Sequence, residues 1–201
     1  MTGARSLVIE TADPASAEAF SRALGVAEHV SAHPSEEPTA GFRGFTLSLV
    51  CAQPGNVDAL LRAALDAGAT TLKPVKKSFW GYGGVVSAPD GTIWKFATST
   101  KKDTAPARPE HDELVLLLGV ADVKASKQFY VERGMDVGKS FGSTYVEFAT
   151  PGAPVKLALY GRKALARDAG VAPEGSGSHR LVVGSDGAAF TDPDGFAWEP
   201  A

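Results

Sequence analysis

The strongest constraint on the fold of this 201-residue chain is a motif that it contains twice. Residues 88–96 read APDGTIWKF and residues 192–200 read DPDGFAWEP, so Pro-Asp-Gly-x-x-Trp occurs in each half. Asp and Gly favour a tight turn, and the alternating residues after them favour a strand. A second pair, ADPASAEAFSRALG at 12–25 and ADVKASKQFYVERG at 121–134, has an Asp suited to start a helix and a Gly suited to end it. Such internal repeats indicate a chain built from related units.

The order of elements within each half predicts an α+β fold. Each repeated helix follows an apolar run, SLVIET in one half and ELVLLLGV in the other, and each half closes on its PDG hairpin. The halves are unequal, because residues 26–44 are mostly polar whereas STYVEFAT and VKLALY are good strand candidates. We predict a partly truncated N-terminal domain at 1–100, a polar linker at 101–111, and a C-terminal domain at 112–201 that lacks the second helix found at 56–68.

Composition excludes several classes of protein. Apolar residues make up 44% and charged residues 21%, which is typical of a globular chain with a real core. With a net charge of −3 and scattered Lys and Arg, no basic stripe is available for nucleic acid or an anionic membrane. No window approaches the roughly 20 apolar residues of a membrane span. The single cysteine, Cys51, favours a buried strand residue in a reducing compartment, so we predict a cytoplasmic protein.

Two stretches resemble a known family. Residues 45–97, including NVDALLRAALDAG, FWGYGG and APDGTIWKFA, look like the second half of a glyoxalase/bleomycin-resistance domain of the vicinal oxygen chelate superfamily, and residues 114–172 look like its first half. The resemblance implies repeated βαβββ modules, with curved mixed or antiparallel sheets enclosing a cleft and helices outside. Residues 41–100 and 112–160 would be complete modules, and the two ends of the chain incomplete ones. Related modules pair edge to edge, so a homodimer is one alternative to a chain that satisfies this need internally.

The resemblance also implies a divalent metal such as Zn, Ni, Mn or Fe, held by His, Gln or Glu in the cleft. One family ligand is the Glu four residues after the PDG glycine, which is Glu199 in one repeat and Lys95 in the other. An ammonium has no lone pair to donate to a metal. The other family positions fall on Ser6, Val115, Gly44 and Leu157, and on Arg180 or, one residue out of register, His179. We therefore predict no metal cofactor; if one is bound, Glu199 and His179 are its candidate ligands.

Several side chains are candidates for binding or catalysis. In the family register Arg180 and Glu199 face each other, where they could orient a carboxylate or phenolate ligand or simply form a surface pair. Trp80 and Tyr82 of FWGYGG could stack on a flat ligand or pack beside a hairpin. Trp94 and Trp198 alternate with Lys95 and Glu199 along their strands and should therefore lie in the core.

These observations leave three functional hypotheses. The first is a metal-independent protein that binds a small organic molecule, aromatic or antibiotic-like, with Trp80, Tyr82, Arg180, His179 and Lys95 as ligand-binding residues. The second is an enzyme of the superfamily, a lyase, isomerase or dioxygenase, that uses His179 and Glu199 on a metal or Glu199 as a general base beside Arg180. The third is a structural or interaction module whose clefts have collapsed, which apolar, filled clefts would support.

Overall fold

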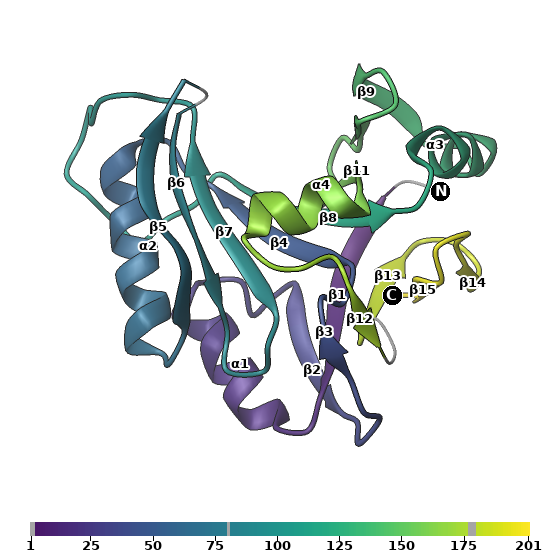
Figure 1. Cartoon of the computed structure of the whole chain (residues 1–201), viewed down its shortest axis with the longest axis horizontal. Coiled ribbons are helices and arrows are strands. Elements are labelled where there is room, and N and C mark those ends of the chain that lie inside the picture. Colours follow the sequence, from purple (N-terminus) through teal and green to yellow (C-terminus); the bar gives the residue numbers. More distant parts are fainter. Residues whose placement is uncertain (1–2, 80, 177–179) are drawn as a thin grey trace.

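The computed structural model describes residues 3–79, 81–176 and 180–201. Its helices are α1 (Pro14–Ala23), α2 (Pro54–Asp66), α3 (Val123–Glu132) and α4 (Arg162–Ala169) (Figure 1). Its strands are β1 (Ala4–Thr11), β2 (Val30–Pro34), β3 (Ala40–Gly41), β4 (Phe45–Val50), β5 (Thr70–Ser78), β6 (Gly81–Ser87), β7 (Ile93–Thr98), β8 (Glu113–Val120), β9 (Asp136–Phe141), β10 (Tyr145–Ala149), β11 (Val155–Gly161), β12 (Gly175–Ser176), β13 (Leu181–Ser185), β14 (Phe190–Thr191) and β15 (Ala197–Pro200).

The larger part of the sheet is built on the antiparallel pair β4 and β8. β7 runs parallel to β4 and leads outward to β6 and β5, while β11 runs parallel to β8 and leads outward to β10 and β9. Each side therefore runs strand, helix and three further strands in chain order, which is the βαβββ arrangement expected from the repeats. The result is a curved, open sheet of mixed direction, which we call the large sheet.

The two ends of the chain form a smaller copy of this arrangement. β1 and β13 pair antiparallel, β2 lies parallel to β1, and β15 lies parallel to β13 with β14 beyond it. A bridge between Ala4 and Val155 joins this smaller part to the large sheet. The polar segment after Gly25, which from sequence resembled a loop, contains β2; its apolar residues Val30 and Ala32 are buried, while Ser31 and His33, which alternate with them, are exposed.

The predicted helix starts are confirmed. The Asp13 carboxylate accepts from the Ser16 amide at 3.1 Å, and the Asp122 carboxylate accepts from the Lys124 amide at 2.8 Å. Both bonds satisfy amides that have no partner within the helix. The repeated Asp therefore marks the start of a helix in both halves.

The main core lies between the sheet and helices α1, α2 and α3. Trp94 and Trp198 are 2% and 1% exposed, as predicted from their alternation with Lys95 and Glu199. Cys51 directly follows β4 and is also buried, and burial raises the pKa of its thiol to about 12. We call this side of the large sheet its convex face and the opposite side its concave face.

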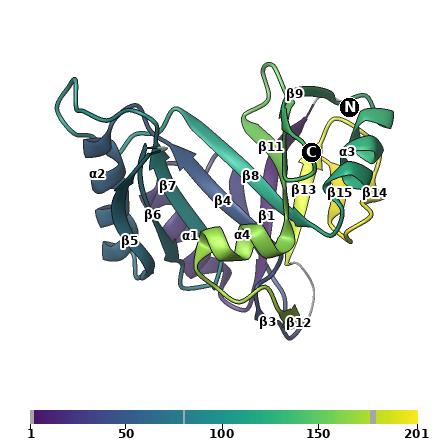
Figure 2. The ribbon, with the colours of Figure 1, turned by 45° about the horizontal axis from the view of Figure 1, so that its top comes forward.

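Helix α4 is the exception to the expectation that helices lie outside. Its buried residues pack with Val85 and Ile93, which alternate along β6 and β7 with the core residues Val86 and Trp94. Since neighbouring residues of a strand point to opposite faces, α4 lies on the concave face. Figures 1 and 2 both show it crossing β4 and β8.

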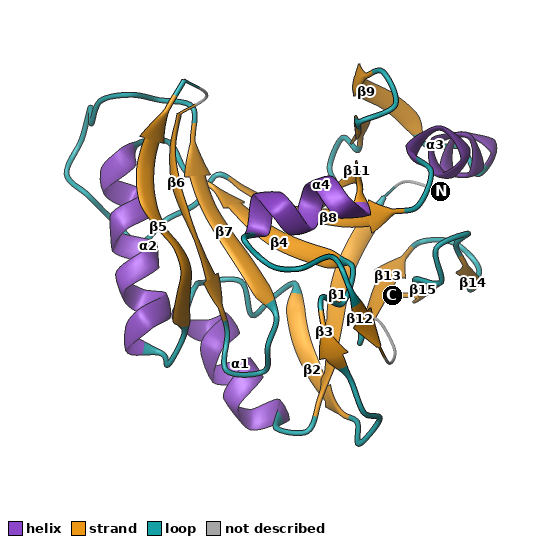
Figure 3. Cartoon of the chain, in the orientation of Figure 1, coloured by secondary structure: helices purple, strands orange, loops and turns teal. Residues whose placement is uncertain are grey.

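The C-terminal half thus carries a second helix, but α4 precedes β13, whereas α2 follows β4 (Figure 3). Because α4 stands at a different place in the chain from α2, the two helices are not repeats of one another. Across the described ranges, none of the helices is both long enough and apolar enough to cross a membrane.

Candidate functional site

One row of residues crosses the centre of the concave face. The registers of the four central strands place Lys95 opposite Ser48, Ser48 opposite Val115, and Val115 opposite Lys156. Lys95 and Val115 are two of the positions at which the family resemblance implied metal ligands. Both ends of the row carry an ammonium group, and between them are a hydroxyl and an isopropyl group.

Each ammonium group of this row is paired with a carboxylate. Lys95 Nζ lies 2.6 Å from Asp168 Oδ2, and Lys156 Nζ lies 2.5 Å from Glu113 Oε1. The Lys95 partner comes from α4, so the helix on the concave face supplies the negative charge beside the position where the family uses Glu. The carboxylates serve as counter-ions to ammonium groups here, and not as members of a convergent ligand set.

A family-type metal does not fit these residues. A transition metal in a protein is usually held by three or four His, Cys, Asp or Glu side chains. Within residues 3–79, 81–176 and 180–201, no three such side chains come together in a way that could hold an ion. Leu157, another family position, is fully buried in the convex core and points away from the cleft.

Helix α4 fills the middle of the cleft with apolar side chains. Leu165, Ala166 and Ala169 are all at most 3% exposed, and they pack in a second cluster separate from the main core. Gly170 ends the helix in a left-handed conformation with φ of 84°. The Lys73 ammonium donates to the carbonyl oxygens of Arg167 and Asp168, both at 2.6 Å, and so holds the last turn against β5.

A hollow of about 500 Å³ remains between the end of α4 and strands β5, β6 and β7. We call it the cleft hollow. Small or apolar groups of Gly83, Val85 and Ala97 line it, together with three lysines and one carboxylate: Lys73, Lys76, Lys95 and Asp168. Its size and its mixture of apolar surface with a few polar groups are those of small-molecule sites.

Of the two aromatic candidates, Tyr82 borders the cleft hollow. Its hydroxyl donates to Asp58 Oδ1 on α2 at 2.7 Å, so the phenol is tied to the helix side of β6 rather than directed across the hollow. This hydrogen bond raises the pKa of Tyr82 to about 12, and the phenol is neutral at pH 7. Trp80 lies outside the described residues.

The predicted pairing of Arg180 with Glu199 is wrong. Glu199 lies opposite Gly184 on β13, four residues beyond Arg180, or roughly 13 Å along a strand. Arg180 instead donates to the backbone carbonyls of Glu10, Ser35 and Glu37. Its guanidinium ties the end of β1 to the chain after β2, while Glu199 is exposed.

Arg180 also has an unusual backbone. Among the residues that the structure describes, Arg180 is the only non-glycine residue with a positive φ, which is 61°. The residue is 5% exposed. A left-handed arginine is tolerated where its surroundings hold it firmly. His179, the other candidate at this register, lies outside the described residues.

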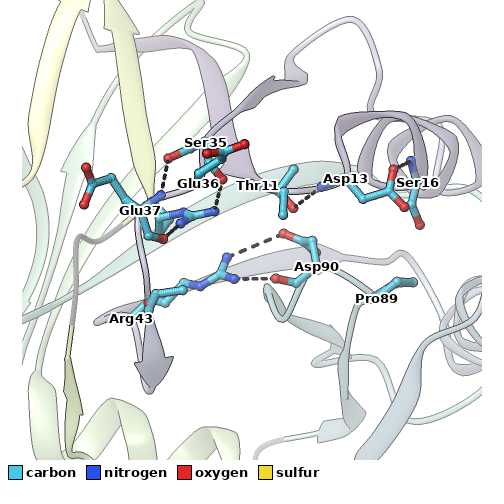
Figure 4. Close-up of a pocket in the computed structure, with 12 residues that line it drawn as sticks. Thr11, Asp13, Ser16, Ser35, Glu36, Glu37, Arg43, Pro89 and Asp90 are labelled. Carbon is cyan, nitrogen blue, oxygen red and sulfur yellow. Dashed lines mark hydrogen bonds and ion pairs between the residues drawn. The ribbon is translucent and has the colours of Figure 1, made fainter.

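A second hollow, of about 340 Å³, lies at the start of α1, and we call it the α1 hollow. Figure 4 shows Arg43 pointing across it toward Asp90, the aspartate of the first PDG turn. Arg43 Nη1 lies 3.5 Å from Asp90 Oδ2, and burial lowers the pKa of the guanidinium. The surrounding side chains carry both signs of charge: Asp13, Glu36, Glu37, Asp90, Arg43 and Arg180.

The second PDG turn makes different contacts from the first one, which borders the α1 hollow. There Asp194 Oδ1 accepts from the Ala121 amide at 2.6 Å and Asp194 Oδ2 accepts from the Ser126 hydroxyl at 2.7 Å, which closes the turn onto the start of α3. In the first repeat the carboxylate of Asp90 bonds to Arg43 and Thr92. The two PDG aspartates therefore have different partners, and Asp90 lines the α1 hollow instead of bonding to the start of a helix.

Comparison with known proteins identifies the architecture. No protein-family model and no curated protein matches this chain. Among solved structures, glyoxalase I from Zea mays superposes with a TM-score of 0.59 at 14% identity, covering 98% of this chain and 90% of that one. A mutant of the same enzyme gives 0.62 at 12% identity, covering 98% and 92%. A candidate dioxygenase from Bacillus subtilis gives 0.60 at 9% identity, covering 98% and 84%.

The chain has the glyoxalase/dioxygenase fold. The resemblance inferred from the sequence is thus confirmed at the level of architecture. At sequence identities of 9 to 14%, the structural similarity establishes the fold and not the activity. In this chain, Lys95 and α4 lie on the concave face, where the resemblance implied a metal and its ligands.

Sequence reasoning missed α4 as a component of the cleft, and with it Lys73 and Asp168. A local signal was present, because RKALARDA at 162–169 is followed by a glycine suited to end a helix. The surface on which a short helix packs is decided by contacts far away in sequence. Asp168 and Lys95 are separated by 73 positions.

Proposed function

We propose that this chain is a glyoxalase-fold protein that binds a small organic molecule in the cleft hollow without a family-type metal. The observation that carries the proposal is the row from Lys95 to Lys156. Its two family ligand positions hold the ammonium group of Lys95 and the isopropyl group of Val115, and neither group can donate a lone pair to a metal. Chemistry that needs two substrate oxygens on one metal therefore has no ligand set in this row. Binding and orientation by the hollow's own side chains require no metal.

The remaining space supports binding. Helix α4 occupies the centre of the cleft and leaves an open region beside β5–β7 with a short, apolar floor. Apolar contact provides most of the affinity of a small ligand in such a site, and a few polar groups fix its orientation. A flat molecule fits this floor because Gly83 and Ala97 present little side-chain bulk.

The proposal can be tested with a panel of small aromatic compounds, namely benzoate, phenol, indole and benzamide, by ligand-observed NMR. We expect at least one to bind the native chain and to lose binding in Ala97→Phe, whose ring would fill the hollow. The matched control is Ala19→Phe, which adds the same ring to an exposed position on α1 and should not alter binding. If no compound binds, or if both variants bind equally, the proposal is wrong and the alternative of a filled, structural cleft is favoured.

A further inference from the structure

We propose that the ligand of the cleft hollow carries a carboxylate, and that this carboxylate replaces Asp168 as the partner of Lys95. The inference rests on the proposed function, since it names the class of molecule that the same hollow would take. In the ligand-free protein, the Asp168 carboxylate would then occupy the position beside Lys95 that the ligand's carboxylate takes on binding.

The charges around the hollow favour an anion. Its lining contains the ammonium groups of Lys73, Lys76 and Lys95 and a single carboxylate, Asp168. A concave, partly apolar site with an excess of one charge concentrates molecules of the opposite charge. An anionic ligand would restore the balance that Asp168 only partly provides.

The Lys95–Asp168 pair is placed so that it can exchange. The two side chains are 33% and 39% exposed, so both are within reach of a molecule in the hollow. Half-exposed ion pairs contribute about 0 to 1 kcal/mol to stability, so another carboxylate can replace Asp168 at little cost. By contrast, a fully buried pair would resist such exchange.

Release of the Asp168 side chain would leave α4 docked. Lys73 holds the last turn through the backbone carbonyls of Arg167 and Asp168, which do not depend on the Asp168 carboxylate. Leu165 and Ala169 keep the helix packed on the concave face. The exchange therefore needs a side-chain rotation and no movement of the helix.

The floor of the hollow indicates the rest of the molecule. Gly83 and Ala97 lie opposite each other on β6 and β7, and Val85 lies opposite Lys95. This arrangement gives a shallow apolar surface that ends at the Lys95 ammonium. A flat apolar body with a carboxylate at one end matches both features, and benzoate is the simplest probe of that kind.

The experiment compares benzoate with benzamide, which has nearly the same shape but no charge, by titration calorimetry or NMR. Three variants are used: Asp168→Asn, Lys95→Met, and Asp136→Asn as an exposed control on β9. We expect Asp168→Asn to bind benzoate about two- to fivefold more tightly than the native chain, because the internal competitor has lost its charge. Lys95→Met should bind benzoate several-fold more weakly, while Asp136→Asn and all benzamide affinities stay unchanged.

The outcomes separate the two proposals. If benzoate and benzamide bind with equal affinity, and neither Asp168→Asn nor Lys95→Met changes the affinity for benzoate, the carboxylate exchange is wrong while binding in the hollow stands. If neither probe binds any form of the protein at millimolar concentration, and the wider aromatic panel also fails, binding in the hollow is overturned as well. A second benzoate titration at high salt should weaken binding, since screening reduces the attraction of half-exposed lysines.

Discussion

Replacing Leu165 with alanine measures directly how firmly α4 is packed into the cleft. The Leu165 side chain is 1% exposed and belongs to the second cluster on the concave face. Removing its outer carbons loses about 0.8 kcal/mol per buried methylene, or roughly 2 kcal/mol, before any cavity term. The cavity term should be small because the open cleft hollow beside the cluster lets neighbouring groups relax. We therefore expect the free energy of unfolding to fall by about 2–3 kcal/mol, the low end for such substitutions.

The assay is urea unfolding at pH 7, followed by the fluorescence of the buried tryptophans. Leu118→Ala provides the comparison, because Leu118 is fully buried in the main core between the sheet and the outer helices, where relaxation is restricted. It should cost about 3–5 kcal/mol. A loss below about 0.5 kcal/mol for Leu165→Ala, in the range of surface substitutions, would show that α4 is not packed on the concave face and would refute the reasoning.

Three further predictions concern other parts of the molecule. Tyr130→Phe should lower the free energy of unfolding by about 1–3 kcal/mol in urea, because the buried Tyr130 hydroxyl accepts from Trp198 Nε1 and donates to a buried carboxylate. Burial lowers the pKa of His111, so stability should fall as pH drops through 6.5, where the unfolded chain takes up a proton that the folded one resists; His111→Gln should remove this slope. Lys95→Glu should lower the melting temperature, because the new carboxylate at position 95 would repel the carboxylate of Asp168, and added zinc should not restore the melting temperature.

The sequence predicted the architecture well because the repeats encode it locally. Asp13 and Asp122 start helices in both halves, and each PDG turn precedes a strand whose tryptophan is buried. Caps, turns and strand alternation depend on neighbouring residues, so they can be recognised without the tertiary structure.

The site was less predictable, because it depends on register and on long-range packing. Arg180 and Glu199 were expected to face each other, but the register pairs Glu199 with Gly184. A shift along a strand moves a side chain by several ångströms, and no local pattern specified the pairing of β13 with β15. The Lys95 position was singled out from the sequence, yet its partner Asp168 comes from a helix whose packing surface the sequence did not reveal.

The repeats also show how one fold can change its contacts. Asp194 in the second half bonds to the start of α3, whereas Asp90 in the first half bonds to Arg43. The aspartate of the same motif thus accepts hydrogen bonds at the start of a helix in one copy and forms an ion pair in the other. Sequence repeats predict which segments correspond and leave their partners open.

The central claim, that Lys95 and α4 replace metal chemistry in the cleft, is tested most directly by the metal content of the chain. The protein would be purified without a histidine tag and incubated with zinc, nickel, manganese or iron(II), and bound metal would be measured by plasma emission after desalting. Our account predicts far less than one metal ion per chain under every condition. A stoichiometric metal that is retained in the native protein, and lost only on unfolding, would contradict it.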